Sequence, residues 1–311
     1  MSLYKYVYWF KRTKPSSYKP VILITGCSSG IGFELAKTFS NIPNYRTVIT
    51  ARAPSVEKLH SLFPSADNIR VWELDITSEI SRNQLVEKIR KEWEGVDILI
   101  NNAGISYRSV IEHMTDKDEL AQMTTNYLGP MALIRNVLPN MRRKGRGKII
   151  NVSSVSGMLA MPTMSSYSAS KAALEGASEA LWYEMRPFGI DVSLIQPGFI
   201  HSDSFKNVRY TERGEKSENN EDEYSAFYRN MKPFVSRLMG MSRTPASKIA
   251  ELILLVVQTE RPPLWVPAGF GAEFFYYLRR LMPRRLLHPV LYRCLPGVEH
   301  WGEGFSKKRS R

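Results

Sequence analysis

Short runs of apolar and β-branched residues alternate with longer amphipathic stretches from about residue 20 to residue 267. Such short runs are typical of strands buried on both faces of a parallel sheet, whereas the longer stretches have the length and periodicity of helices. We predict strands at 21–25, 47–51, 69–74, 98–101, 148–152, 192–195 and 264–266. Helices are expected near 30–41, 81–94, 116–143, 166–187 and 245–258. The alternation predicts an α/β fold, a single Rossmann-type, doubly wound parallel sheet of about seven strands.

One connection interrupts this rhythm. Residues 201–240 have a charged, poorly patterned middle that is followed by aromatic and apolar positions. Because a connection of this length within a compact domain is usually a lid or a binding loop, we expect a substrate loop or lid here. The chain then divides into an N-terminal extension (1–19), one α/β domain (20–269) and a C-terminal tail (270–311). Ligands of such sheets bind at the edge where the strands end.

Composition fits a folded protein, because 43% of the 311 residues are hydrophobic and 23% are charged. The two cysteines, Cys27 and Cys294, lie far apart in the chain, and no Cys/His group has the spacing of zinc ligands. These features favour a cytoplasmic protein that holds no metal. The net charge of +13 is concentrated at the two ends, since residues 1–20 hold five basic residues and no acid, and residues 277–311 hold nine basic residues and two acids.

Aromatic residues and leucines are mixed with paired arginines between residues 274 and 287. We interpret the tail as a basic amphipathic segment in peripheral contact with an anionic membrane, with a solvated cationic tail as the alternative. A nucleic-acid contact is a third interpretation, and we expect no such partner. No stretch approaches the roughly 20 apolar residues that a membrane-spanning helix needs. The aromatic N-terminal run, which Lys5 interrupts, lacks the features of an export signal.

A glycine-rich turn joins the first predicted strand to the first predicted helix. Its sequence is Thr25-Gly26-Cys27-Ser28-Ser29-Gly30-Ile31-Gly32. Glycines allow a tight turn and a close approach of the backbone to a pyrophosphate, while the helix N-terminus presents free N–H groups to the anion. A turn of this kind can also be a plain structural bend. We interpret Gly26, Ser28, Ser29, Gly30, Ile31 and Gly32 as dinucleotide contacts.

The end of the second strand decides which dinucleotide is expected. A carboxylate there would bind the ribose hydroxyls of NAD and repel a 2′-phosphate. The strand instead ends Thr50-Ala51-Arg52, and the guanidinium fork of Arg52 suits a phosphate, to which Ser28 can add a hydroxyl donor. This pattern predicts NADP(H). The alternative is that Arg52 is a solvated cation at the end of a strand.

A tyrosine and a lysine four residues apart lie on one face of a predicted helix. An ammonium beside the phenol of Tyr167 favours the tyrosinate, and in the reductive direction the neutral phenol can donate its proton. Ser154 ends a strand thirteen residues earlier, so a strand-to-helix loop can bring its hydroxyl to the phenol. Alternatively, Tyr167 and Lys171 are a surface pair, Ser154 only caps a helix, and Asn126 is an ordinary buried amide.

Together these motifs resemble the short-chain dehydrogenase/reductase family, over residues 20 to 269. The matching pieces, in order, are Thr25-Gly26-x3-Gly30-x-Gly32, Asp75-Ile76, Asn101-Asn102-Ala103-Gly104, Asn126, Ser154, Tyr167-x3-Lys171 and Pro197-Gly198. The resemblance implies a dinucleotide-binding catalytic domain whose catalytic residues are Asn126, Ser154, Tyr167 and Lys171. It also implies that Asn126 positions a water that links Lys171 to solvent. A homodimer or homotetramer is expected, paired through the helices that hold Asn126 and Tyr167.

The resemblance also implies further cofactor contacts. Asp75 and Ile76 would flank the adenine. The cofactor groove would be lined by Asn102, Ala103 and Gly104, with Tyr167 and Lys171 on its catalytic side. Ile200 and Ser202 would approach the carboxamide, and Pro197 and Gly198 are further cofactor contacts.

The closest likeness within the family is to the 17-beta-hydroxysteroid and retinol dehydrogenase branch. The residues that carry it are 23–32, 169–176 and Ile200-His201-Ser202. Two segments are expected to line an apolar, methionine-rich substrate pocket, namely Met158, Leu159, Met161 and Met164, and Phe227, Tyr228, Met231 and Phe234. Such side chains suit a lipophilic substrate of steroid, retinoid or long-chain type, unless they belong to the core. We therefore predict an NADP(H)-dependent oxidoreductase, with a non-catalytic dinucleotide-binding sensor or scaffold as the alternative.

Overall fold

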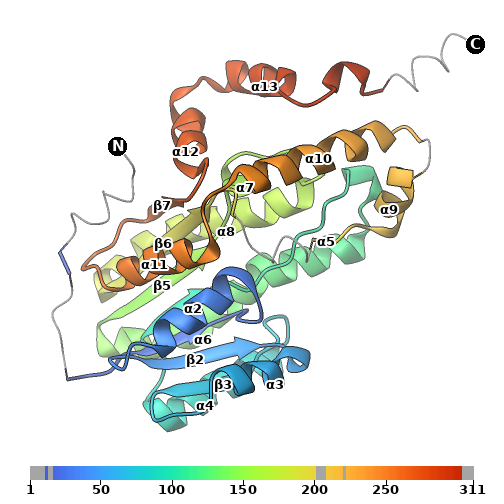
Figure 1. Ribbon diagram of the computed structural model, residues 1–311. Helices are drawn as coiled ribbons and strands as arrows, with labels where there is room; N and C mark the ends of the chain where they lie inside the picture. The colour runs from blue at the N-terminus through green and yellow to red at the C-terminus, as the bar shows by residue number, and fades with distance from the viewer. Residues whose placement is uncertain (1–10, 13–16, 201–207, 220–221, 303–311) are drawn as a thin grey trace, which may run out of the picture.

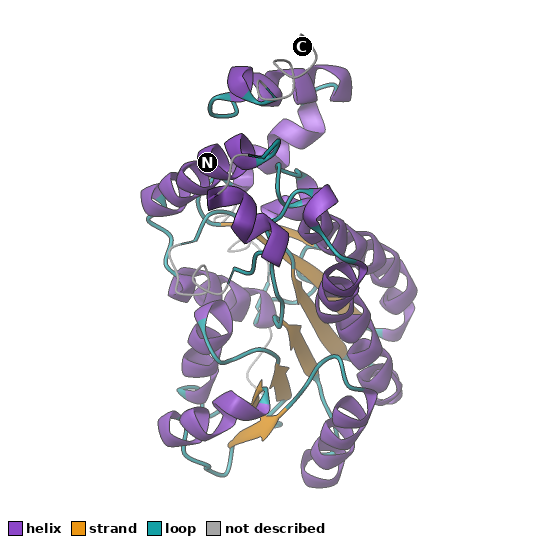
Figure 2. Cartoon of the chain, turned by 90° about the vertical axis from the view of Figure 1, so that its right-hand side faces the viewer, coloured by secondary structure: helices purple, strands orange, loops and turns teal. Residues whose placement is uncertain are grey.

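A seven-stranded parallel sheet lies between two groups of helices in the computed structural model, which describes residues 11–12, 17–200, 208–219 and 222–302 (Figures 1 and 2). The strand order is β3-β2-β1-β4-β5-β6-β7. The strands are β1 Val21–Ile24, β2 Arg46–Ala51, β3 Ile69–Glu73, β4 Ile98–Asn101, β5 Gly147–Val152, β6 Ile190–Pro197 and β7 Trp265–Ala268. The predicted doubly wound sheet is confirmed, and the order reverses between β1 and β4, where such sheets bind their ligands.

Helices connect the strands. They are α2 Gly30–Ser40, α3 Ala53–Leu62, α4 Glu79–Trp93, α5 Asp116–Met123, α6 Gly129–Lys144, α7 Val155–Met158, α8 Ser165–Met185, α9 Glu212–Asn219, α10 Ser225–Met241, α11 Ala246–Val257, α12 Ala272–Leu281 and α13 Arg284–Arg293. The single helix predicted at 116–143 is two helices, α5 and α6, with a π-helical turn between them at Thr124–Leu128. α3 was not predicted.

The hydrophobic core has two parts, one on each face of the sheet. In β1, Ile22 and Ile24 belong to the part that packs against α2 and α11, and Val21 and Leu23 belong to the part against α4 and α6. All four side chains are fully buried. Burial on both faces explains why the strands read as continuous apolar runs in the sequence.

The connection after β6, which the sequence indicated as a lid or a substrate loop, is largely helical in its described residues, and we refer to residues 208–219 and 222–241 as the lid. Within its described residues, α9 and α10 lie over the loop that follows β4. The Tyr228 hydroxyl accepts a hydrogen bond from Val110 N at 3.1 Å and lies 2.8 Å from Nδ1 of His113. Ser109 and Thr211 are joined through their hydroxyls at 2.9 Å. These contacts anchor the lid to the body of the protein.

The C-terminal tail begins with two helices that lie at the top of Figure 1. α12 packs against α7 and β7, and its Ala272 is fully buried. Within the described residues, every helix is either too short or too polar to cross a lipid bilayer.

Candidate active site

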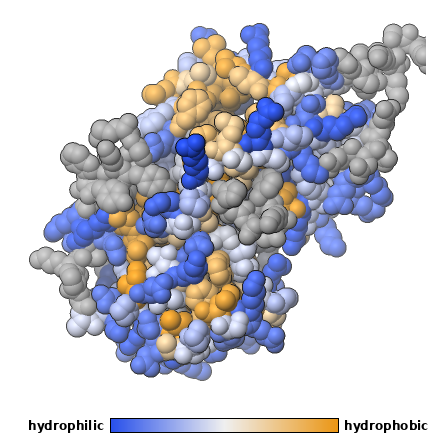
Figure 3. Space-filling model, viewed as in Figure 1, coloured by the Kyte–Doolittle hydropathy of each residue, from blue (hydrophilic) through white to orange (hydrophobic). Residues whose placement is uncertain are grey.

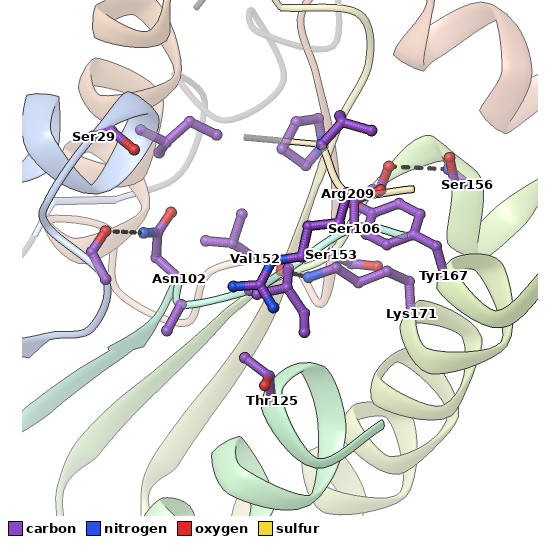
Figure 4. Close-up of a pocket in the computed structure, with 18 of the residues that line it drawn as sticks. Ser29, Asn102, Ser106, Thr125, Val152, Ser153, Ser156, Tyr167, Lys171 and Arg209 are labelled. Carbon is purple, nitrogen blue, oxygen red and sulfur yellow. Dashed lines mark hydrogen bonds between the residues drawn. The ribbon is translucent and has the colours of Figure 1, made fainter. Parts of the chain in front are cut away.

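A pocket of about 1300 Å³ opens at the edge where the parallel strands end. The loops after β1, β2, β3, β4, β5 and β6 contribute to its wall, together with the lid and α12. Figure 4 shows Asn102 on one side of this pocket and Tyr167 and Lys171 on the other. This volume exceeds that of a typical small-molecule site, so it has room for a dinucleotide and a substrate together.

The glycine turn after β1 forms one wall of the pocket. Gly26 has a φ of +73°, a left-handed conformation that suits glycine. A methyl group at Gly32 would lie 2.1 Å from Gly26 O and 2.4 Å from Asn102 Nδ2, so no larger residue fits. Asn102 holds the turn by donating to Thr25 O at 3.0 Å and to Gly26 O at 3.1 Å. The turn is thus a rigid cradle at the N-terminus of α2, and it fits a pyrophosphate.

At the end of β2, Arg52 is exposed and precedes the first turn of α3. Burial raises the pKa of Asp75, but hydrogen bonds from Thr77 and the charge of Arg52 outweigh burial, and the pKa is lowered overall. Arg52, Asp75 and Ile76 all line the pocket. The guanidinium of Arg52 makes this end of the pocket suitable for a phosphate.

The predicted catalytic side chains meet on the other side. Tyr167 and Lys171 project from α8, with Lys171 Nζ 6.0 Å from the centre of the Tyr167 ring. Lys171 donates to Val152 O at 2.9 Å. Ser154 hydrogen-bonds the Tyr167 phenol and also caps α7 by accepting from Ser156 N at 3.1 Å. The cap that we considered as an alternative role for Ser154 is therefore present together with the contact to the phenol.

Burial controls the protonation of the pair. Burial raises the pKa of Tyr167, against the hydrogen bond from Ser154 and the charge of Arg108, which both lower it. Burial also lowers the pKa of Lys171 to about 8, an effect that the charge of Glu175 partly offsets. At neutral pH, Tyr167 therefore holds its proton and can donate it, while most of the Lys171 side chains are ammonium ions.

Asn126 lies in the π-helical turn and is 1% exposed, behind the pocket wall. Its amide accepts from Ile105 N and donates to Ile105 O, both at 2.9 Å, and it donates to Ser170 Oγ at 3.0 Å. A methyl group at Gly104 would lie 3.2 Å from Asn126 Oδ1 and 3.6 Å from Lys171 Nζ, so the two side chains are neighbours. π-Helical turns are common at functional sites.

The remaining predicted contacts have a mixed outcome. Ten further predicted residues line the pocket, namely Gly26, Ser28, Ser29, Ile31, Asn102, Ala103, Gly104, Pro197, Gly198 and Ile200. Gly30 and Gly32 shape the turn behind it. Ser202 lies outside the described residues.

The predicted apolar lining is partly wrong. Leu159, Met161 and Met164 line the pocket, but α10 contributes Val235 and Met239 in place of the four residues that we predicted there. Tyr228 and Met231 are each 2% exposed and pack within the protein, as in the core alternative. The face of α10 that reaches the pocket could not be read from the aromatic pattern alone.

Three residues with clear contacts were missed. Arg108 follows the turn after β4, Phe275 reaches the pocket from α12, and Glu175 is buried one helical turn beyond Lys171. An isolated arginine, phenylalanine or glutamate carries no motif, and only the spacing of Glu175 from Lys171 gave a local signal.

Comparisons with known proteins agree with this geometry. Residues 20–213 match the family model described as short chain dehydrogenase. The 3-ketodihydrosphingosine reductase of Bacteroides thetaiotaomicron is 36% identical over 252 residues, which are 80% of this chain and 87% of that protein. Retinol dehydrogenase 8 of Homo sapiens is 30% identical over 285 residues, 88% of this chain and 90% of that protein. The second similarity agrees with the branch predicted from the sequence.

Two solved structures share the fold. The structure of ElxO with NADP bound has a TM-score of 0.66 and 27% identity, and the match covers 82% of this chain and 99% of that one. A short-chain dehydrogenase/reductase from Burkholderia phymatum in complex with NAD has a TM-score of 0.69 and 22% identity, covering 86% and 94% of the two chains.

Proposed function

The chain belongs to the short-chain dehydrogenase/reductase family of oxidoreductases, and we propose that it uses NADP(H) to interconvert a carbonyl and an alcohol on a lipophilic substrate. One observation carries this proposal. The Tyr167 phenol is hydrogen-bonded to Ser154, and Lys171 lies one helical turn beyond Tyr167, in the same pocket as the glycine cradle. A non-catalytic sensor or scaffold would not need this set, so the alternative is not favoured.

Each of the four predicted catalytic residues has its own role in carbonyl reduction. When bound, the dinucleotide supplies the hydride. Tyr167 donates its proton to the carbonyl oxygen, and the Ser154 hydroxyl orients that oxygen as negative charge develops. The Lys171 ammonium stabilises the tyrosinate that remains. Asn126, which neighbours Lys171, would position a water through which the proton is replaced. In the oxidative direction the same groups act in reverse.

Two features support NADP(H) over NAD(H). Arg52 stands where a carboxylate would select NAD, and α3 begins directly after it, so a 2′-phosphate would meet a guanidinium and a helix N-terminus. Asp75 is the one acidic residue among the described residues that line the pocket, and the positive charges of Arg52 and Arg82 offset part of its negative charge. The NADP bound to ElxO is compatible with this choice, although the more distant relative binds NAD.

The wall of the pocket beyond Tyr167 supports a lipophilic substrate. The apolar side chains that line it are Leu120, Leu159, Met161, Met164, Val235, Met239 and Phe275. Thioethers and aromatic rings adapt to bulky apolar molecules. The names of two relatives, a ketodihydrosphingosine reductase and a retinol dehydrogenase, point to substrates of this general type.

The tail would lie at an anionic membrane surface. In Figure 3 an apolar patch covers the region of α12 and is bordered by hydrophilic residues. The exposed apolar residues of α12 and α13 are Phe274, Tyr277, Leu281, Leu286, Val290 and Tyr292. The same helices carry Arg279, Arg280, Arg284, Arg285 and Arg293. Rings and leucines beside cations are typical of helices that rest in the headgroup region of a bilayer.

We also propose that the protein pairs with a second copy through α5, the π-helical turn and α8. Leu128 and Tyr183 are 46% and 64% exposed on the π-helical turn and α8. Exposed large apolar side chains on neighbouring helices favour a homodimer or homotetramer. Sedimentation equilibrium of the protein, with a Leu128→Glu variant as the comparison, tests this contact.

The function is tested by following the oxidation of NADPH and of NADH with a ketosteroid, retinal and a long-chain ketone. We expect steady turnover with NADPH on at least one of these compounds, and weaker turnover with NADH. Binding of NADPH without turnover on any carbonyl compound would favour the sensor or scaffold instead.

A further inference from the structure

Two arginines are brought together where the lid meets the body. Residues 106–108 and 208–209 pair as short parallel backbone segments, with Tyr107 opposite Arg209. Arg108 N donates to Arg209 O at 2.8 Å, and Arg209 N donates to Ser106 O at 2.9 Å. Both Arg108 and Arg209 line the pocket, and Figure 4 shows Arg209 in the same pocket as Tyr167 and Lys171. We call the paired segments the lid seam.

Arg108 lies within electrostatic reach of the reacting phenol. Burial lowers the pKa of its guanidinium, while the side chains of Tyr210 and Tyr167 favour the charged form. In return, the charge of Arg108 lowers the pKa of Tyr167. A guanidinium that has lost part of its water gains strongly from an anion that binds beside it.

Charge is distributed unevenly along the pocket. Asp75, after β3, is the one acidic residue among the described residues that line it. The cationic lining residues are Arg52, Lys117, Lys171 and, at the lid seam, Arg108 and Arg209. In the strand order, β1 and β2 separate β3 from β4, after which Arg108 lies. The substrate end is therefore cationic and apolar at once, a combination that favours an anionic amphiphile over a neutral lipid or an amine.

We propose that the lid seam binds an anionic head group, a carboxylate or a phosphate, on a substrate whose apolar chain lies along the methionine-lined wall. This inference rests on the proposed function, because it names the class of substrate for the same site. Arg108 is the main anion contact, and Arg209 adds a second guanidinium from the lid. A long-chain carbonyl compound with an amino group, by contrast, would meet like charge here.

Binding of unreactive amphiphiles tests the proposal without any need for turnover. The probes are dodecanoate, dodecyl phosphate, dodecanol and dodecylamine, below their micelle concentrations, titrated calorimetrically into the full chain saturated with NADP. We expect at least one of the two anions to bind about tenfold more tightly than dodecanol, or tighter still. Dodecylamine should bind most weakly of the four probes. The stronger of the two anions identifies the head group as carboxylate or phosphate.

Two variants assign the effect to the lid seam. Arg108→Met keeps the apolar stem and removes the charge. The anion should then bind no more tightly than dodecanol, while the affinities for dodecanol and for NADPH stay unchanged. Arg209→Met should reduce, but not abolish, the difference in affinity between the anion and dodecanol. Arg213→Met is the matched control, because Arg213 is an exposed lid residue that pairs with Glu112 and does not line the pocket.

Three results would overturn the proposal. The first is that neither anion binds the unmodified protein more tightly than dodecanol does. The second is that Arg108→Met and Arg209→Met leave the difference in affinity between anion and dodecanol unchanged. The third is that Arg108→Met weakens NADPH binding instead, which would assign the guanidinium to the cofactor. If Arg108→Met fails to fold, the unmodified protein and Arg209→Met still decide the question. Absence of turnover with every carbonyl compound would count against the proposed function alone, since these titrations measure binding.

Discussion

Glu175 lies one helical turn beyond Lys171 on α8, and its carboxylate supports the charge of the lysine ammonium. Oε1 of Glu175 accepts hydrogen bonds from Ser153 Oγ at 2.7 Å and from Gln196 Nε2 at 2.8 Å. Ser153 precedes Ser154 in the chain, so this buried glutamate connects the two strand ends behind the pocket with the helix that carries Tyr167.

Removal of this charge should change the pH dependence of reduction. Glu175→Gln keeps an oxygen that can accept both hydrogen bonds, so it removes the charge alone. The carboxylate raises the pKa of Lys171, which is about 8 in the unmodified protein, so its loss should lower this pKa. The ammonium is present below its pKa and is lost as the pH rises through it, so the alkaline limb of kcat/KM should move to lower pH.

The measurement is a pH profile of NADPH-dependent reduction for both proteins. Glu179→Gln, an exposed change one turn further along α8, is the control. An alkaline limb that stays in place in Glu175→Gln would mean that the carboxylate does not act on Lys171.

Tyr167→Phe should remove the proton donor and little else. We expect kcat to fall by about a hundredfold to ten-thousandfold, the usual contribution of general acid catalysis. NADPH affinity, measured by fluorescence titration, should not change. Tyr183→Phe on the same helix is the control, because this ring is 64% exposed. Unchanged turnover in Tyr167→Phe would show that another group transfers the proton.

Arg52→Gln should weaken the binding of NADPH but not of NADH. Loss of a charge-assisted hydrogen bond to a phosphate corresponds to about a tenfold to hundredfold loss of affinity. Lys58→Gln removes an exposed cation from the neighbouring helix α3 and serves as the control. Equal losses for both dinucleotides would contradict selection of the 2′-phosphate by Arg52.

Arg284→Gln combined with Arg285→Gln should weaken sedimentation with phosphatidylserine vesicles. At about 1 kcal/mol for each cation near an anionic surface, the partition coefficient should fall roughly thirtyfold at low salt. Arg142→Gln combined with Arg143→Gln removes the same charge from exposed positions on α6. If both pairs have the same effect, or neither has one, the tail is not the contact.

The sheet and the centre of the site could be predicted because their signals are local. Continuous apolar runs, glycines at fixed spacing and Tyr167 four residues before Lys171 each follow from one element or one turn. α3 also has a local signal in the sequence, Pro54 in its first turn, directly after the strand end at Arg52.

The sequence indicated a lid or substrate loop at 201–240, but the contacts of the lid and the lining of the substrate end could not be predicted, because they join distant segments. Tyr228 binds to His113 and Val110 across more than one hundred residues, and no local pattern marks either partner. In the sequence Arg108 looks like a solvated cation. It becomes half-buried through the pairing of its loop with residues 208–209, which lie beyond β6.

Phe275 connects the C-terminal tail to the reaction chamber, the pocket that holds Tyr167. Its ring contacts Phe199 edge-on, with 6.2 Å between the centroids, and it forms part of the pocket wall. A truncation before α12 would therefore open the chamber as well as remove an anchor, and a chimera that borrows its last forty residues from a relative would inherit part of that relative's selectivity. Experiments on where the protein resides should thus use point changes on the outer face of the tail.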